Sequence, residues 1–328
     1  MTHPSNKPCP LDIVTLLGLH EALITAESTG ILKAALGTLR TAAEYAQELN
    51  LNERATERIL EVLAAAGFLQ IDGPRYGWLQ TPSASSLPVP LVLSAMRKHF
   101  SHTPHWVRTG ELLGLMDGTL EQREASYTSL VADMGRGFAV AATHLAAKLD
   151  LKPERILDVG CGSGVWSLEI AARVPGSHVT GVDFPTVLDA FKARAEQMGM
   201  KERIATIAGD MYDVAIPDEQ FDLVIVANVV RLEPPDRARK LLSLLSRAVR
   251  PGGHMVVVDA LAGGTPTKDL VRAVYALHLG LRTQVGMVHS PTHIRQWLQQ
   301  AGLDEVKDID CGVQVGAIGA IGGHKKPC

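Results

Sequence analysis

The sequence has few of the features that mark secreted, membrane-spanning or nucleic-acid-binding proteins. No apolar run approaches the ~20 residues that a membrane-spanning helix needs. Residues 1–10 are polar and proline-rich, unlike a secretory signal peptide. Lysine and arginine (32) do not outnumber aspartate and glutamate (35), and the net charge of −3 gives no electrostatic reason to expect nucleic acid. These features predict no membrane and no nucleic-acid partner, and 328 residues suffice for two domains.

Cysteine is scarce, and its positions do not suggest a metal site. The four cysteines (Cys9, Cys161, Cys311 and Cys328) form no pair with metal-ligand spacing. His99, His102 and His105 recur every three residues, but a metal site needs three or four converging ligands, which this run does not supply. We therefore expect no metal, and a reduced, cytoplasmic protein is the simplest interpretation.

Three short motifs in the C-terminal half carry the strongest functional signal. An apolar run over 155–159 ends in Gly160, Gly162 and Gly164, and a helical pattern follows. Glycine permits a positive φ in the turn and lets a ligand approach bare backbone. The next apolar run, 178–182, ends in Asp183, and a carboxylate at that place can accept both hydroxyls of a ribose. Gly209-Asp210-Met211 follows a third apolar run over 204–208.

The C-terminal half alternates between strand-like and helix-like patterns. This alternation predicts a parallel sheet with helices on both faces. The last two apolar stretches are separated only by Cys311-Gly312, which predicts an antiparallel pair that closes the sheet. The expected strands are 155–159, 178–182, 204–208, 221–227, 254–259, 305–311 and 313–321.

Taken together, the motifs resemble those of class I S-adenosylmethionine (SAM)-dependent methyltransferases. That family has D-x-G-x-G-x-G after strand one, an acid after strand two and G-D-(M/F) after strand three. The resemblance implies a Rossmann-like seven-stranded α/β sheet that binds SAM and its product S-adenosylhomocysteine. It implies that Asp183 holds the ribose, that Asp210 and Met211 flank the adenine, and that Gly160 faces the methionine end. The expected cofactor-binding set is Asp158, Gly160, Gly162, Asp183, Phe184, Asp210, Met211 and Asn228.

The N-terminal half has no such alternation. Residues 11–36, 41–49 and 52–67 have helical patterns, and 69–79 reads as a small hairpin with Asp72-Gly-Pro at its tip. Helix, helix and hairpin make a winged helix. Because residues 41–80 hold three basic and six acidic side chains, DNA binding is not favoured. The arrangement instead resembles the dimerisation domain of small-molecule O-methyltransferases of plants and bacteria, which implies a homodimer.

The predicted domain organisation has three parts. A winged-helix-like, mainly α-helical dimerisation domain covers 1–85, a helical connector that roofs the substrate pocket covers 86–150, and the SAM-binding domain covers 151–328. Methionine and aromatic side chains in the connector suit a flat organic substrate, although any core uses them too. The expected substrate-contacting set is Trp106, Met134, Phe138, Tyr275 and Arg282.

One departure from the resemblance concerns the catalytic base. O-methyltransferases of this family carry a histidine after strand four, in a V-L-H-D-W-D-D-E context. Aligning Val229-Val230 with the V-L places Arg231 at the histidine position. Arginine cannot act as a base at neutral pH, since its pKa exceeds about 12. The usual deprotonation of a phenol is therefore not expected.

Three alternatives remain open for the chemistry. The acceptor could need no strong base, as with a carboxylate, an amine or an electron-rich carbon, and Arg231 would then anchor an anionic group. Another residue could act as the base: Asp259 follows strand five, and His278 and His289 lie in a region that faces substrate in the family. Finally, the chain could hold SAM while catalysing hydroxylation or decarboxylation. The expected catalytic set is Arg231, Asp259, His278 and His289.

The sequence thus predicts a cytoplasmic, homodimeric SAM-dependent methyltransferase that acts on a small molecule of the secondary-metabolite type. Carbon, nitrogen or carboxylate methylation is favoured over base-assisted methylation of a phenol. A winged-helix regulator that senses a ligand is the less favoured alternative from another class.

Overall fold

The computed structural model describes residues 13–77, 90–261, 266–312 and 318–327, and it divides the chain into two compact units. The units comprise residues 1–98 and 99–328, so the division falls within the predicted connector rather than at its start. Each unit has its own hydrophobic core.

The N-terminal unit consists of short helices and a three-stranded sheet. Its elements are α1 (Ile13–Ser28), α2 (Ile31–Ala34), β1 (Arg40–Thr41), α3 (Ala42–Leu49), α4 (Glu53–Ala65), β2 (Gln70–Asp72), β3 (Arg75–Gly77) and the start of α5 (Pro90–Ser101). The long helix expected over 11–36 is broken at Gly30, whose φ of +84° ends one helix before the next begins. The small sheet has the order β1-β3-β2 and is antiparallel.

Local sequence signals account for the predicted pair of helices and the hairpin. Thr41 accepts a hydrogen bond from the Glu44 N–H, and Glu44 accepts one from the Thr41 N–H, which forms a capping box at the start of α3. The Tyr45 hydroxyl donates to the Tyr76 carbonyl at 3.0 Å, which ties α3 to β3 through the core. The hairpin predicted over 69–79 is present in its described part, up to Gly77.

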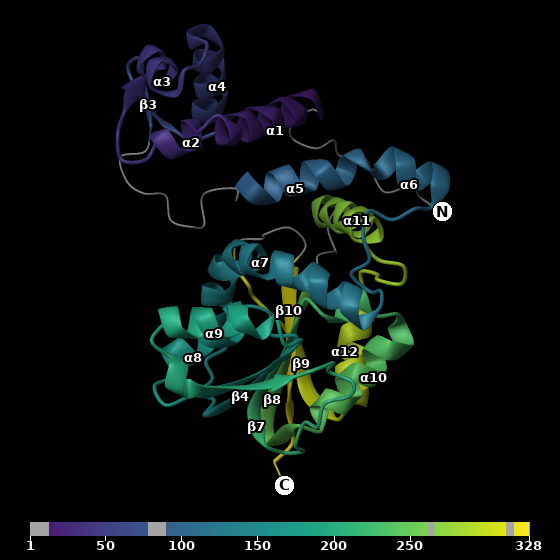
Figure 1. Ribbon diagram of the computed structural model, residues 1–328. Helices are drawn as coiled ribbons and strands as arrows, with labels where there is room; N and C mark the ends of the chain where they lie inside the picture. The colour runs from purple at the N-terminus through teal and green to yellow at the C-terminus, as the bar shows by residue number, and fades with distance from the viewer. Residues whose placement is uncertain (1–12, 78–89, 262–265, 313–317, 328) are drawn as a thin grey trace. The chain divides into compact units, whose positions relative to one another are not determined.

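The C-terminal unit contains the mixed α/β fold (Figure 1). Its helices are α6 (Thr103–Thr109), α7 (Leu120–Lys148), α8 (Val165–Arg173), α9 (Leu188–Gln197), α10 (Pro235–Ser246), α11 (Pro266–Gly280) and α12 (Pro291–Gln300), with two short 3-10 helices, η1 (Lys201–Arg203) and η2 (Val230–Leu232). Its strands are β4 (Arg155–Val159), β5 (His178–Asp183), β6 (Ile204–Ala208), β7 (Phe221–Ala227), β8 (Val249–Ala260), β9 (Leu303–Ile309) and β10 (Ile318–Lys325).

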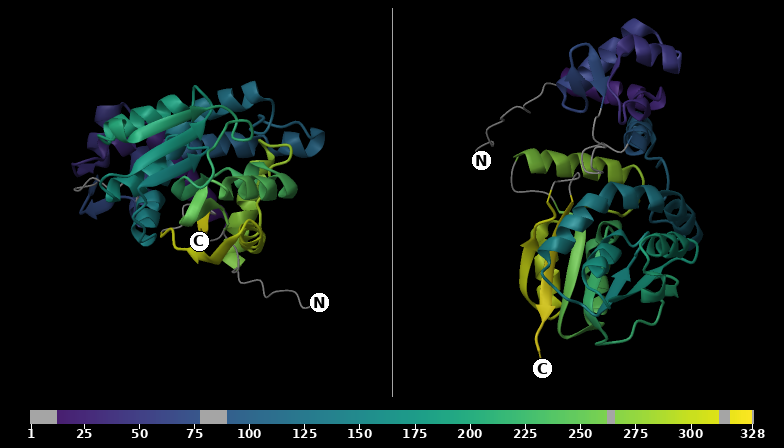
Figure 2. Two further views of the ribbon diagram at one scale, coloured as in Figure 1. Left: turned by 90° about the horizontal axis from the view of Figure 1, so that it is seen from below. Right: turned by 90° about the vertical axis from the view of Figure 1, so that its left-hand side faces the viewer.

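The seven-stranded sheet has the order β6-β5-β4-β7-β8-β10-β9. Strands β4 to β8 pair in parallel, whereas β10 is antiparallel to both β8 and β9. The C-terminal strands lie together at one edge of the sheet, in yellow in Figure 2. The fold class and the antiparallel pair predicted from the sequence are confirmed, and β8 is longer than the predicted 254–259.

Alternate residues of the central strands point to opposite faces of the sheet. Ile156 packs into one core with α7, α8 and α9, whereas Leu157 packs into the other with α10 and α12 (Figure 1). Four of the five β4 side chains are buried, because helices cover both faces. The glycine loop directly follows β4. The carboxyl ends of β4, β5, β6 and β7 therefore meet at one edge of the sheet.

Two glycine variants test this packing. We expect Gly181→Ala to lower the free energy of unfolding by about 1–3 kcal/mol. A Cβ added to this β5 residue would lie 2.9 Å from both Cys161 Sγ and Phe191 Cε1. Gly137→Ala, in α7, meets no atom within 4 Å and should raise stability by up to ~1 kcal/mol through helix propensity. Chemical denaturation measures the free energy of unfolding of both variants. An equal change in the two would contradict the tight packing around Gly181.

Candidate functional site

A cavity opens where the parallel strands end. It has an empty volume of about 680 Å³, part of which is solvent, and its lining comes from the glycine loop, α7, α8 and the residues after β5, β6 and β7. The lining residues are Arg123, Tyr127, Val131, Gly135, Phe138, Gly160, Cys161, Gly162, Ser163, Val165, Trp166, Asp183, Phe184, Val187, Met211, Ala227, Asn228, Val229 and Leu232.

The glycine loop requires glycine for both conformation and space. Gly160 and Gly162 have φ of +69° and +54°, in the left-handed region that other residues rarely adopt. A Cβ on Gly160 would lie 2.5 Å from Val229 Cγ2, and one on Gly162 would lie 2.9 Å from Val131 Cγ2. The loop therefore brings bare backbone to the cavity.

Asp183 lies at the end of β5 and faces the same cavity. Its Oδ2 accepts the Gly162 N–H and its Oδ1 accepts the Phe184 N–H, both at 2.8 Å. Burial raises the pKa of Asp183, and these two hydrogen bonds oppose the rise. A carboxylate has about four lone-pair sites, so two remain for the hydroxyls of a ribose.

Several buried polar atoms in and behind the cavity have no hydrogen-bond partner among the described residues. They are Ser163 Oγ, Trp166 Nε1 and Asp158 Oδ1. The other oxygen of Asp158 accepts the Ser167 hydroxyl at 2.5 Å, and burial raises the pKa of Asp158 to about 7. Buried polar atoms are normally paired, so these atoms fit a site that receives a polar ligand.

The predicted adenine side of the site is held by an ion pair. Arg123 Nη1 lies 2.9 Å from Asp210 Oδ2, and the Arg123 guanidinium lies 5.2 Å from the centre of the Phe184 ring. Met211 lines the cavity, whereas Asp210 is turned to Arg123 and to the Tyr212 N–H. Asp158 likewise lies behind the lining, against Ser167.

The residues present therefore fit SAM, although the fit does not assign each contact. Six of the eight residues in the expected cofactor-binding set line the cavity: Gly160, Gly162, Asp183, Phe184, Met211 and Asn228. The loop supplies bare backbone, Asp183 retains acceptor capacity, and Ser163 and Trp166, each with a buried polar atom that has no partner among the described residues, line the cavity.

Arg231 lies in η2 after β7, and it is one of the few buried charged residues of this unit. Its Nη1 lies 3.0 Å from Asp259 Oδ1 and 2.6 Å from Asn228 Oδ1, and its backbone N–H donates to Asp259 Oδ2 at 3.0 Å. Asp259 also accepts the Ala260 N–H. Electrostatic attraction from Tyr275 and Asp259 outweighs desolvation and raises the pKa of Arg231, which stays charged.

The hydrogen bonds of His278 fix its tautomer. Arg282 Nη2 lies 3.1 Å from His278 Nδ1, and an arginine can only donate, so Nδ1 carries a lone pair. The proton of the neutral ring is then on Nε2, which lies 2.6 Å from His99 Nδ1. Burial, with Arg282 second, lowers the pKa of His278 to about 3. In this arrangement His278 is a neutral acceptor for Arg282.

His289 is buried beneath η2. Its Nε2 lies 3.1 Å from the Val230 carbonyl and 3.0 Å from the Glu233 carbonyl, and burial lowers its pKa. The ring thus donates to the backbone that carries Arg231. Of the four predicted catalytic residues, Arg231 and Asp259 contact each other directly, and His289 bonds to the backbone on either side of Arg231. His278 bonds instead to Arg282 and His99.

The predicted substrate contacts fall into three places. Phe138 lines the cofactor cavity, and its ring centre lies 5.8 Å from that of Trp166. Tyr275 and Arg282 accompany Arg231 and His278. The Met134 side chain lies outside the described part of the structure.

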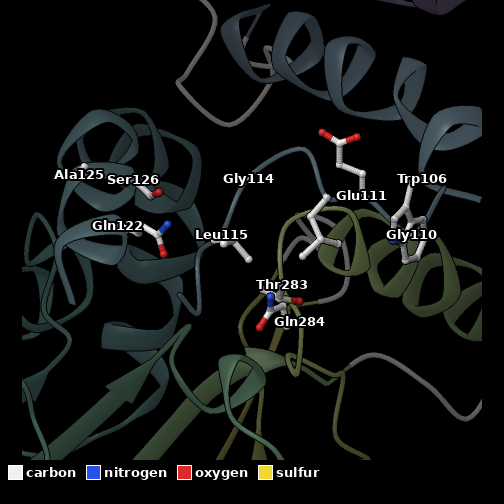
Figure 3. Close-up of a pocket in the computed structure, with 11 residues that line it drawn as sticks. Trp106, Gly110, Glu111, Gly114, Leu115, Gln122, Ala125, Ser126, Thr283 and Gln284 are labelled. Carbon is white, nitrogen blue, oxygen red and sulfur yellow. The ribbon is translucent and has the colours of Figure 1, made fainter. Parts of the chain in front are cut away.

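Trp106 lines a second pocket, whose empty volume of about 1430 Å³, part of which is solvent, is larger than that of the cofactor cavity (Figure 3). This pocket lies between α6, the segment over 110–115, α7 and the residues after α11. Gln122, Ala125 and Ser126 of α7 face it, whereas Arg123 and Tyr127 of the same helix face the cofactor cavity. One helix thus forms a wall of both pockets.

Sequence reasoning missed most of the α7 contribution. Ser163 and Trp166 could have been found, since they continue the glycine loop into the first turn of α8. Arg123 and Val131 gave no signal, because their spacing is that of any packed helix. Tyr127 belongs to the aromatic side chains of the connector that are expected at the substrate pocket, but it lines the cofactor cavity. In the described residues, no group of three His, Cys, Asp or Glu side chains could hold a metal ion, and no helix is long and apolar enough to cross a membrane.

The buried ion pair yields a stability prediction. We expect Asp259→Asn to lower the free energy of unfolding by about 3–5 kcal/mol, because it leaves the Arg231 charge buried without its partner. The control is Asp218→Asn, which removes the partner of exposed Arg247 and should cost less than about 1 kcal/mol. Urea denaturation measures the free energy of unfolding of both variants. A small loss of similar size in the two would mean that the buried charge of Arg231 does not need Asp259 as its partner.

Comparison with known families gives a match over more than half of the chain. Residues 117–304 match the O-methyltransferase domain family. This range runs from the end of the segment before α7 to β9, and it contains both the glycine loop and Arg231.

Curated relatives and solved structures agree with that match. The chain is 26% identical to 3-hydroxy-5-methyl-1-naphthoate 3-O-methyltransferase of Streptomyces sahachiroi, over 96% of this chain and 94% of that protein. Acetylserotonin O-methyltransferase of Bos taurus is 32% identical over 51% of this chain and 47% of its own length.

The fold is also shared with two solved proteins. A putative O-methyltransferase from Nostoc punctiforme superposes with a TM-score of 0.76 at 20% identity, over 97% of this chain and 100% of its own. Human N-acetylserotonin methyltransferase, solved in complex with SAM, gives 0.70 at 21% identity, over 97% and 99%. With the cavity and its glycine loop, these matches show that the chain belongs to the O-methyltransferase family and is a SAM-dependent methyltransferase.

Proposed function

We propose that this methyltransferase transfers the methyl group of SAM to a carbon, nitrogen or carboxylate of a small molecule, rather than to a phenol that a protein base deprotonates. The observation that carries the proposal is the buried Arg231–Asp259 pair. The motif resemblance aligns Arg231 with the catalytic histidine of the family. Arg231 cannot accept a proton at neutral pH.

The other candidate bases are also engaged. Asp259 accepts three hydrogen bonds, two from Arg231 and one from the Ala260 N–H. His278 accepts from Arg282, and His289 donates to backbone carbonyls. A carboxylate or a neutral amine attacks through a lone pair that is already free, and an electron-rich carbon loses its proton to water only after the methyl group has been transferred. None of these nucleophiles needs a protein base before it attacks.

The protein's part in the reaction is then binding, orientation and exclusion of water. SAM, when bound, supplies an electrophilic methyl group. We expect Asp183 to hold the ribose hydroxyls and the glycine loop to lie against the methionine end, with Phe184 and Met211 beside the adenine. Phe138 and Trp166 give the cavity an aromatic wall. Fixing the nucleophile in line with the methyl group supplies the rate enhancement through proximity and orientation.

The relatives support a small, secondary-metabolite type of acceptor. The names of the Streptomyces and Bos relatives specify methylation at oxygen on a naphthoate and on acetylserotonin, and this chain departs from the family pattern at Arg231. Free thiols at buried Cys161 and Cys311 accord with a reducing, cytoplasmic setting, which stays part of the proposal.

A pair of variants tests the cofactor assignment. Asp183→Asn should weaken binding of S-adenosylhomocysteine by about ten-fold or more, because a neutral amide replaces the charged acceptor of two hydroxyl hydrogen bonds. Calorimetric titration measures this. Asp189→Asn, on the exposed surface of α9, is the control and should bind as the wild type does. Equal affinities of the two variants would refute the role of Asp183.

The acceptor is tested in the same preparation with SAM carrying a labelled methyl group. Carbon nucleophiles, amines and carboxylates should become labelled. Efficient labelling of ordinary phenols at pH 7 would show that a base exists and would sink the proposal.

We further propose that the protein is a homodimer, paired through the N-terminal unit. Helix α1 contains no basic side chain apart from His20, and its start is apolar and exposed: Ile13 is 81%, Val14 73% and Leu17 61% exposed. Exposed apolar side chains grouped in this way are typical of protein interfaces.

Light scattering with size-exclusion chromatography tests the dimer. The wild type should have about twice the 35.2 kDa chain mass. Leu17→Glu should shift the mass toward that of one chain, because it places a charge in the apolar contact. Leu244→Glu, at an apolar site of α10 that is 39% exposed, should leave the mass unchanged. A wild-type protein of one chain mass would rule the dimer out.

A further inference from the structure

The charges around the Arg231 site are unevenly compensated. Two guanidinium groups, Arg231 and Arg282, flank the contacting rings of Tyr275 and His278. The Arg231 guanidinium lies 5.5 Å from the centre of the Tyr275 ring, and Arg282 Nη2 lies 3.1 Å from His278 Nδ1. Asp259 neutralises Arg231. In the part of the chain that the structure describes, no carboxylate lies within ion-pair distance of Arg282, so the cluster retains one positive charge.

The hydrogen bonds of Arg282 leave part of its capacity unused. Its Nε–H is 3.4 Å from the His278 carbonyl, one Nη2–H donates to His278 Nδ1 at 3.1 Å, and one Nη1–H points to Met116 Sδ at 3.0 Å. A guanidinium has five N–H donors, so one on each terminal nitrogen has no acceptor among the described residues. Two adjacent donors of this kind match the two oxygens of a carboxylate.

Hydrogen bonds and neighbouring aromatic rings hold Arg282 in place. His278 is a fixed neutral acceptor, and its ring contacts those of Phe100 and Tyr275, with centres 5.7 and 6.3 Å apart. The Tyr275 ring also lies 5.5 Å from the Arg231 guanidinium. A charge-assisted hydrogen bond is stronger in such a partly buried, aromatic setting than in water.

The cluster contacts residues that line the cofactor cavity. Tyr127 lines that cavity and donates its hydroxyl to the carbonyl of Met116, the residue whose sulfur meets Arg282. Asn228 also lines the cavity, and its Oδ1 accepts from Arg231. A molecule bound at Arg282 would therefore lie beside bound SAM.

We propose that the acceptor is an anionic aryl carboxylate, and that Arg282 binds its carboxylate as an anchor while another atom of the acceptor receives the methyl group. This inference rests on the proposed function. The single uncompensated charge of the cluster matches a monoanion better than a phosphate dianion. A carboxylate that accepts hydrogen bonds from a guanidinium is a weakened nucleophile, which is why the anchored group is not itself the methylated one. The proposal narrows the methylated atom to carbon or nitrogen.

Matched acids and amides test the anchor. Binding of salicylate and of its uncharged counterpart salicylamide is measured by calorimetry on the full-length protein saturated with S-adenosylhomocysteine. The same comparison is made with benzoate and benzamide. Wild-type protein should bind each acid about ten-fold or more tightly than its amide, since a hydrogen bond to a charged group is worth about that factor.

Two variants assign the preference to Arg282. Arg282→Gln should abolish the preference for acids and leave amide binding within about two-fold, whereas Arg282→Lys should keep part of it because the charge remains. The control is Arg173→Gln, which removes an exposed positive charge at the end of α8. It should bind as the wild type does.

The outcomes separate this inference from the proposed function. Equal binding of acids and amides by the wild type, or an acid preference that survives in Arg282→Gln, overturns the anchor. Failure to bind S-adenosylhomocysteine overturns the cofactor assignment instead, and it is measured first in every variant. Should Arg282→Gln fail to fold, the comparison of acid with amide in wild type and in Arg282→Lys still decides the question.

Discussion

The pairing of β4 between β5 and β7 is the constraint on which the rest of the C-terminal unit depends. Ile156 to Val159 are in parallel register with β7, and the whole strand is in parallel register with β5. Because helices cover both faces, a slip of the register would turn buried side chains toward the wrong core. The fixed register brings the ends of β4, β5 and β7 to one edge, and with them the glycine loop, Asp183 and Asn228.

The packing behind the glycine loop links the core to the cavity. Gly160 lies against Val229, the residue before η2, and Gly162 lies against Val131 of α7. The β5 residue Gly181 makes room for Cys161 and Phe191. The backbone that faces the cofactor is therefore held by apolar contacts rather than by its own hydrogen bonds alone. Its geometry should depend on the volume of side chains that never meet a ligand.

Buried charge determines the chemistry that remains available next to this cavity. Arg231 brings a permanent positive charge into a buried site, and Asp259 compensates it. That compensation engages the acid that could have acted as a base. Arg282 is a second guanidinium, and its charge is supported only by neutral acceptors among the described residues. On our proposal, Arg231 and Arg282 together disfavour deprotonation of the acceptor and favour an acceptor that is an anion.

The sequence by itself determined the parallel sheet, its antiparallel ending and the nucleotide-type loop. Those features depend on local periodicity and on glycine, whose conformational freedom is a property of the residue. It also identified Arg231, because a motif is contiguous along the chain. The tertiary structure decided what these residues meet. It turned Asp158 and Asp210 away from the cavity toward Ser167 and Arg123, made one helix the wall of two pockets, and set the partners of Arg231, His278 and Arg282. Such contacts join residues up to 179 positions apart, and no local pattern encodes which of them will be neighbours.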